Sequence, residues 1–316
     1  MTPGAPRGAL PAGLLVGLAC GLVVPFIWSG WIVASRFGVT HALTPFDVTA
    51  LRVGVAAVLV SPVALRYGLG GLAFGKAIVI SAGAGALFGA TSFGGMALAP
   101  VAHAGVLANG TMPIVAALLG WLWLGQRLRR SQLAGMALIL AGVLAIGGES
   151  LFAAPVPGQW LGDLLFVASG ALFAGYMTAL RAWNVQIRQA IVAVPVVSSL
   201  FYLPVWALFL PSGLVPGVLG DAPLPPWPEV ALQAVYQGMV ASILVVVLVT
   251  RTTRSVGPTV MAVFLSAVPG MATLLAIPLL GEWPGPLAVA GLAVATAGML
   301  LAVGLRRGQR EPEAAA

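Results

Sequence analysis

Charged side chains are scarce in this chain. Asp, Glu, Lys and Arg make up 7% of its 316 residues, whereas hydrophobic residues make up 60%. An ordinary soluble domain is about a quarter charged. So few polar side chains could not cover the surface of a water-soluble fold. The composition therefore predicts an integral membrane protein and argues against a soluble enzyme or binding domain.

Cysteine and histidine are nearly absent as well, with one Cys and two His. Cys20 lies inside an apolar run, so a disulfide within the chain and a thiolate metal site are both excluded. No HExxH zinc motif, no GxSxG nucleophile motif and no acid pair at catalytic spacing occurs in the sequence. We expect no enzymatic activity, no cofactor and no bound metal. An intramembrane enzyme or a scaffold stays open as a distant alternative.

Long apolar runs are what the chain has instead. A bilayer span needs about 20 mostly apolar residues. Ten runs meet that need: 13–35, 47–65, 77–99, 102–124, 131–148, 160–180, 190–210, 229–250, 256–280 and 285–304. We therefore expect an all-α membrane protein with ten transmembrane helices, whose surroundings are the lipid bilayer.

The distribution of cations predicts the orientation of these helices, because Lys and Arg gather in cytoplasmic segments. With the N-terminus inside, thirteen of the 15 Lys and Arg residues fall on the cytoplasmic side, and only Arg36 and Arg52 on the other. We expect both termini in the cytoplasm. The same pattern explains the net charge of +7 as a topology signal, so nucleic acid is not an expected partner.

A repeat relates the two halves of the chain. A shift of 156 residues places Pro113 on Pro269, Gly125 on Gly281, Gly135 on Gly291, Gly142 on Gly298 and Gly148 on Gly304. The cations Arg127, Arg129 and Arg130 meet no cation after this shift. Because a basic cluster marks the cytoplasmic side, we expect the second copy to be inverted. The predicted divisions are a first unit 1–148, an external connector 149–159, a second unit 160–304 and a cytoplasmic tail 305–316.

The repeated run resembles a known family. It reads Pro113 … Leu124-Gly125-Gln126 … Gln132 … Gly135 … Ala141-Gly142, with the echo Pro269 … Leu280-Gly281-Glu282 … Gly291 … Ala297-Gly298. This pattern resembles the EamA repeat of the drug/metabolite transporter superfamily, as do Trp28-Ser29-Gly30 and Arg52. The resemblance implies two inverted five-helix repeats around a central cavity, and outward movement of small metabolites across a bacterial inner membrane.

Acids are missing from the middle of every predicted span. Exchange of a proton against a cationic drug would call for a carboxylate there. We therefore expect a secondary transporter that exports amino-acid-like or other small polar metabolites by alternating access. A proton-coupled multidrug efflux antiporter is the alternative. The sequence leaves the coupling ion and the oligomeric state open, a homodimer included.

Arg52 lies roughly 7 Å into its predicted helix and is a candidate for binding a substrate carboxylate. The alternative is a side chain that reaches the interface and bonds exposed carbonyls or Asp47. Polar and aromatic residues on neighbouring spans are further candidates for the wall of a cavity, with ordinary helix packing as the alternative for each. They are Trp28, Ser29, Phe88, Thr91, Ser92, Asn109, Ser169, Phe173, Tyr176, Tyr236, Gln237 and Ser266.

Two prolines and one histidine complete the candidates. Pro113 and Pro269 are expected to break their helices and to expose backbone to a cavity, or else to leave a simple kink. His103 falls at the external start of the fourth span, and histidine is the side chain that changes its charge nearest neutral pH. It is a candidate proton sensor, or a histidine satisfied at the interface.

Overall fold

The computed structural model describes residues 12–148, 157–215 and 224–303, and every regular element within them is a helix. In this part of the chain nine helices are long and apolar enough to cross a membrane, and a shorter apolar helix follows at Pro286–Ala302. The ten predicted spans are therefore confirmed as helices. Large apolar side chains such as Leu65 (88% exposed) and Phe209 (74%) stay on the surface, as a lipid environment requires.

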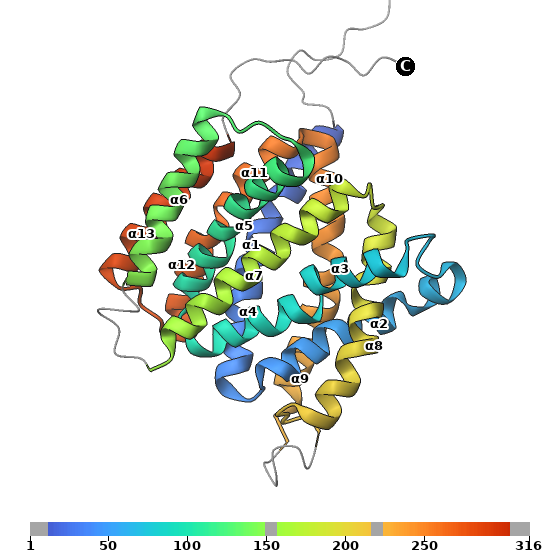
Figure 1. Cartoon of the computed structure of the whole chain (residues 1–316). Coiled ribbons are helices and arrows are strands. Elements are labelled where there is room, and N and C mark those ends of the chain that lie inside the picture. The colour runs from blue at the N-terminus through green and yellow to red at the C-terminus, as the bar shows by residue number, and fades with distance from the viewer. Residues whose placement is uncertain (1–11, 149–156, 216–223, 304–316) are drawn as a thin grey trace, which may run out of the picture.

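The first five spans are α1 (Ala12–His41), α2 (Pro45–Tyr67), α3 (Phe74–Ala84) with α4 (Ala86–Leu98), α5 (Val101–Leu124) and α6 (Arg130–Gly148). The last five are α7 (Gln159–Ala182), α8 (Ile187–Phe209), α9 (Trp227–Gln233) with η2 (Ala234–Leu244) and α10 (Val245–Val256), α11 (Pro258–Ser266) with α12 (Val268–Leu280), and α13 (Pro286–Val303). Helix α1 extends beyond its predicted end at residue 35 to His41, and so contains Arg36. The first turn of α1 and the last turn of α13 lie at the same end of the bundle (Figure 1).

The repeated glycines end two equivalent helices in the same way. Gly125 follows α5 with φ 63°, and Gly281 follows α12 with φ 68°, both in the left-handed region. A residue with a Cβ is strained in that conformation, and glycine is not. Both repeats therefore need glycine at this position for the same reason, which is the left-handed backbone conformation that ends the helix.

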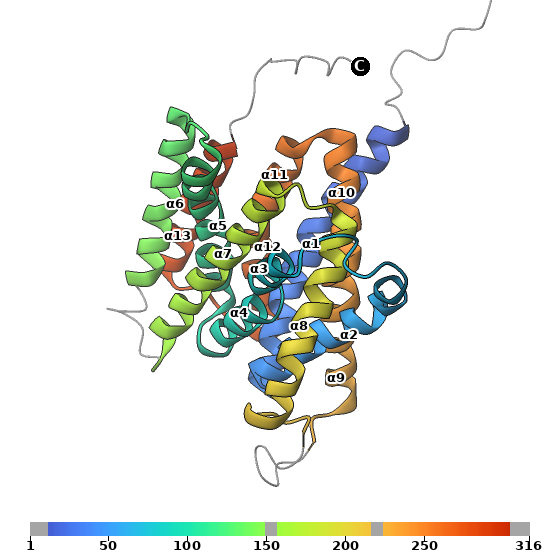
Figure 2. The same cartoon turned by 45° about the vertical axis from the view of Figure 1, so that its right-hand side comes forward.

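The helices α6 and α13 lie side by side at one edge of the bundle (Figures 1 and 2) and meet through four glycines. A Cβ placed on Gly142 would lie 2.5 Å from the Gly291 oxygen, and one on Gly135 would lie 2.6 Å from the Gly298 oxygen. These contacts make the two helices antiparallel. The repeat equates Gly135 with Gly291 and Gly142 with Gly298, so each contact converts into the other. Equivalent helices thus run in opposite directions, as inverted repeats require.

Other interfaces occur in matching pairs. Helix α5 packs along α7, and its equivalent α12 packs along α1. Helix α3 packs against α8, and its equivalent η2 packs against α2. All four interfaces join a helix of the first half to a helix of the second. The two inverted halves are therefore interlocked rather than placed side by side.

Three spans are interrupted. The third bends at Gly85, where a Cβ would collide with the Ser198 hydroxyl that accepts a bond from the Ala86 N–H (3.2 Å). The eighth contains the π-helix η2, and the ninth breaks at Ala267, two residues before Pro269. The expected break at Pro113 is wrong, because α5 is continuous from Val101 to Leu124. One missing N–H leaves the rest of a 24-residue helix intact.

Candidate functional site

Arg52 lies against aromatic rings inside the bundle. Its Cζ is 5.8 Å from the centroid of the Trp31 ring and 5.5 Å from that of Phe88. The Phe88 ring is 5.4 Å from Phe173, which is 5.4 Å from Tyr176. These five residues, here called the Arg52 cluster, come from α1, α2, α4 and α7. Helices of both halves therefore meet at this guanidinium.

The Arg52 side chain is half-buried although protein surrounds it. Since α2 begins at Pro45, Arg52 is about 10 Å along it, roughly a third of the way across a hydrocarbon core. The ion pairs of the described residues are Arg36–Glu282 and His103–Asp163, and neither includes Arg52. Within the described part of the chain, no carboxylate neutralises its charge.

Asp47, the partner that the sequence suggested for Arg52, is bound elsewhere. Its buried carboxylate accepts bonds from Thr44 (N–H, 3.0 Å; hydroxyl, 2.9 Å), from the Trp206 indole (3.0 Å), from the Ser212 hydroxyl (2.6 Å) and from the Gly213 N–H (3.0 Å). This network ties the start of α2 to the end of α8. Neutral donors thus satisfy Asp47, and the interpretation of Arg52 as its partner is wrong.

A buried amide network fixes the ring on which Arg52 lies. The Trp31 indole donates to Gln237 Oε1 (2.6 Å), and Gln237 Nε2 donates to the Ser35 hydroxyl (2.8 Å) and to Gln233 Oε1 (3.0 Å). Gln233 in turn donates to the Ala34 carbonyl (2.6 Å). The π-helix η2 carries Gln237 against α1, and this contact sets the orientation of the Trp31 indole.

The structure brings together part of the predicted set. Arg52, Phe88, Phe173 and Tyr176 meet in the cluster, with Gln237 directly behind Trp31. Ser29 and Tyr236 instead join helices, donating to the carbonyls of Val268 (3.1 Å) and Ile27 (2.9 Å). Others donate to a carbonyl within their own helix: Thr91 to Leu87, Asn109 to Gly105, Ser169 to Phe166 and Ser266 to Val263. Ser92 is buried, and Trp28 packs against hydrophobic core residues.

Sequence reasoning missed Trp31, Ser35 and Gln233. Trp31 lies three residues after Trp28, so the two indoles share one side of α1. That spacing was a usable signal for Trp31. The partners of Ser35 and Gln233 are about 200 residues apart along the chain, and a single sequence carries no sign of such a pairing.

A second polar group joins α1 to the ends of α4, α5 and α12. Arg36 Nε donates to Glu282 Oε1 (2.6 Å), and the Val101 N–H at the start of α5 donates to Glu282 Oε2 (2.8 Å). Arg36 also donates to the Met96 carbonyl at the end of α4. The segment after α12 is thereby held to α1 and α5. Glu282 is a structural link between the two halves.

His103 is buried and bonded to an aspartate. Its Nδ1 is 2.8 Å from Asp163 Oδ1, and the two residues are 2% and 7% exposed. The pair joins α5 to α7. The start of α5 is covered by protein on all sides, because every residue from Val101 to Leu107 is buried.

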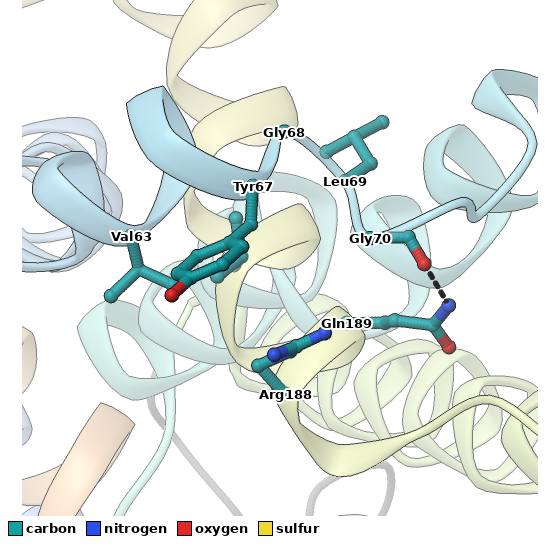
Figure 3. A pocket seen from close by; sticks show the side chains of 8 residues that line it. Val63, Tyr67, Gly68, Leu69, Gly70, Arg188 and Gln189 are labelled. Atoms are coloured by element: carbon teal, nitrogen blue, oxygen red, sulfur yellow. Dashed lines mark hydrogen bonds between the residues drawn. The ribbon is translucent and has the colours of Figure 1, made fainter.

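A narrow crevice lies between the end of α2 and the start of α8 (Figure 3). It is lined by Val63, Tyr67, Gly68, Leu69, Gly70, Arg188, Gln189 and Val192. Gln189 Nε2 donates to the Gly70 carbonyl (2.7 Å) and holds the turn after α2 against α8 (Figure 3). No member of the Arg52 cluster lines this crevice, so it is a helix junction distinct from the cluster. Within residues 12–148, 157–215 and 224–303, no group of three His, Cys, Asp or Glu side chains could hold a metal ion.

Comparisons with known proteins found a family model, a curated relative and a solved structure similar to this chain. Residues 15–148 match the model of the EamA-like transporter family. The chain is 31% identical over 214 residues to the "Uncharacterized transporter YwfM" of Bacillus subtilis (strain 168), covering 66% of this chain and 67% of that protein. A solved structure described as "Crystal structure of protein" has a TM-score of 0.60 and 21% identity, covering 92% of this chain and 96% of the other. That likeness shows the fold.

Proposed function

Because the chain belongs to the EamA-like transporter family, we propose that it is a secondary transporter exporting small metabolites that carry a carboxylate, amino acids above all. The proposed setting is a bacterial inner membrane with both termini in the cytoplasm. The observation that carries the proposal is Arg52, a half-buried guanidinium between aromatic rings of both halves. Within the described residues no acid pairs with it.

An anion is the ligand that this arrangement favours. A cation inside an apolar bundle is costly unless something compensates its charge. The two ring faces supply about 1–2 kcal/mol each when desolvated. A substrate carboxylate could add two parallel N–H···O bonds to the guanidinium, which is the geometry that arginine suits best. The rings of Phe173 and Tyr176 would then border the rest of the substrate.

The same charge argues against a cationic cargo. A second cation about 5.5 Å from Arg52 would be repelled by about 3 kcal/mol at an effective dielectric constant of 20. Asp47, Asp163 and Glu282 each bind partners away from the cluster, and no ion pair of the described residues joins Glu229 to Arg52. Export of lipophilic cations is therefore the weaker alternative.

Alternating access is the mechanism that the inverted halves support. The interfaces α5–α7 and α1–α12 are equivalent by the repeat, as are α3–α8 and α2–η2. Opening one member of a pair while closing the other would expose the Arg52 cluster to each side in turn. The proposed direction, outward, is the direction that the family resemblance implies.

The test is amino-acid efflux from liposomes that contain the purified protein. A mixture of the twenty 14C-labelled amino acids is loaded inside, and release is compared with that from protein-free liposomes. Arg52→Ala removes a charge-assisted pair, which is worth about 1.5–3 kcal/mol. We expect the apparent substrate affinity to fall by about 10- to 150-fold.

The matched control is Arg66→Ala, which removes an exposed arginine from the last turn of the same helix and should leave efflux unchanged. Release from wild-type liposomes no faster than from protein-free ones would contradict the proposal. Ethidium release in place of amino acids would support the multidrug alternative.

A further inference from the structure

The pair His103–Asp163 has an oxygen with no partner. Asp163 Oδ1 lies 2.8 Å from the His103 ring, whereas Asp163 Oδ2 is buried and has no hydrogen bond within the described part of the chain. The aspartate side chain is 9% exposed. A buried ionised carboxylate normally accepts bonds at both oxygens. Among the described residues, Asp163 Oδ2 therefore lacks a donor that would stabilise a permanent negative charge on the carboxylate.

The His103–Asp163 pair then has two protonation states, which differ by one proton. With a neutral imidazole and an ionised carboxylate, the pair carries one net negative charge in a buried place. One added proton makes it neutral, either as imidazolium and carboxylate or as imidazole and carboxylic acid. An uncompensated buried charge costs several kcal/mol. A pair with no net charge avoids that cost.

We propose that His103 and Asp163 form one proton-binding site, and that a proton carried there is the ion coupled to transport. This rests on the proposed transport function. Release breaks the N–H or O–H bond of the pair, passes the proton to water and leaves the pair with one negative charge. Because that charge needs hydration, the proton leaves only when α5 and α7 separate. Proton release is thereby tied to a movement between the two halves.

The surroundings leave the pair as the proton site at this end of the helices. Of the elements packed against α5 and α7, helices α4, α12 and α13 contain no titratable side chain. Glu282 reaches the Val101 N–H, two residues before His103, but its charge is paired with Arg36 at 2.6 Å. The remaining charged or titratable groups of these elements lie toward the other end of the bundle or on its surface: Cys20, His41, Lys76, Arg130, Tyr176 and Arg181.

The fold itself does not demand this pair. The repeat shift of 156 places Thr259 at the position equivalent to His103. A shift of 149, which aligns Gly13 with Gly162, places Leu14 at the position equivalent to Asp163. The matching interface between α1 and the ninth span therefore forms without a titratable pair. A structural requirement common to both interfaces cannot explain His103 and Asp163.

The experiment separates substrate movement from proton coupling. Wild type, Asp163→Asn, His103→Gln and the control Thr178→Val are placed in liposomes with the 14C-labelled amino-acid mixture. Thr178 is a buried residue of the same helix α7, and its hydroxyl donates within that helix to the Ala174 carbonyl (2.8 Å). Exchange is measured with equal amino acids on both sides, and accumulation is measured under a pH gradient. Pyranine trapped inside reports proton movement.

For wild type and Thr178→Val we expect exchange, together with accumulation of up to about tenfold per pH unit for one proton per substrate. Asp163→Asn mimics the neutral state, so it should keep exchange while losing accumulation and the pyranine signal. If Asp163→Asn does not fold, His103→Gln is judged by the same two assays. Asp163→Glu, which keeps a protonatable group, should restore part of the accumulation.

Two results would overturn the inference. One is wild-type exchange with no response to the pH gradient, and the other is undiminished accumulation in folded Asp163→Asn and His103→Gln. Failure of the wild type to move any amino acid in either assay would instead contradict the proposed transport function. The two failures are thus distinguishable.

Discussion

Arg52 is free to bind a substrate anion partly because the neighbours of Asp47 keep that aspartate from pairing with it. Five donor atoms satisfy that aspartate, all of them neutral, so the nearest acid on α2 does not compete for the guanidinium. The ring beneath Arg52 is oriented by the Trp31–Gln237 bond. Single side chains well away from any substrate therefore decide whether the binding charge is free and correctly placed.

Gln237→Leu tests the orienting role of the amide. The substitution leaves the Trp31 indole N–H without an acceptor and the buried Gln233 Oε1 without its donor, at a cost of about 1–3 kcal/mol. We expect a lower thermal unfolding temperature and weaker amino-acid binding, both measured on purified protein. Ser61→Ala, which removes a hydroxyl bonded within α2, is the control and should change neither. Unaltered amino-acid binding in Gln237→Leu would show that the hydrogen bond to Gln237 is not needed to orient Trp31.

At the scale of the element, helices here approach one another through glycine. Helices α6 and α13 contain no charged residue beyond Arg130, so no ion pair along their contact holds them together. Close backbone contact must do so, through dispersion and small residues. This explains why the repeat preserves glycines over 156 residues of separation while its charges change.

Gly142→Ala should separate these two helices. The added methyl group would lie 2.5 Å from the Gly291 oxygen and 2.9 Å from the Ala295 nitrogen, both backbone atoms. We expect a loss of about 1–3 kcal/mol, seen as a lower unfolding temperature in detergent. Gly147→Ala in the same helix has open space and should be neutral or up to about 1 kcal/mol more stable. Equal unfolding temperatures for the two variants would refute the close contact.

The helices could be predicted from the sequence, whereas the network of side-chain contacts could not. Span length and cation position predicted all ten spans, because apolar runs of that length have few other uses. The sequence also pointed to Arg52, Phe88, Phe173 and Tyr176. It gave no means of finding that Asp163 faces His103, since 60 residues separate them. An acid at a helix end reads as exposed, whereas its actual burial depends on which helix packs over it.

At the scale of the whole molecule, the two halves are joined at one end by Arg36 and Glu282. The repeat places Gln126 at the position equivalent to Glu282, and the shift of 149 places Val185 at that of Arg36. The opposite end therefore has no charge at either equivalent position. The fold is symmetric, but this ion pair joins the two halves at one end only. The halves are therefore held together more firmly on the proposed external side.

The double variant Arg36→Met/Glu282→Gln should be more stable than either single variant. Removing one partner leaves a partly buried charge uncompensated, whereas removing both leaves none. We expect each single variant to lose about 1–3 kcal/mol and the pair to show coupling of similar size. The measurement is thermal unfolding of all four proteins in detergent. Strictly additive losses would show that the two residues act independently.

The contact between α6 and α13 has a consequence for how this chain can change. Gly142 meets Gly291, and their repeat equivalents Gly298 and Gly135 meet each other. The surface of α6 is thus complementary to an inverted copy of itself, as in the two-fold interface of a homodimer. A substitution at this contact in one half changes the packing of the other half, so α6 and α13 must evolve together where they meet. Elsewhere, where each half meets unlike helices, they are free to diverge.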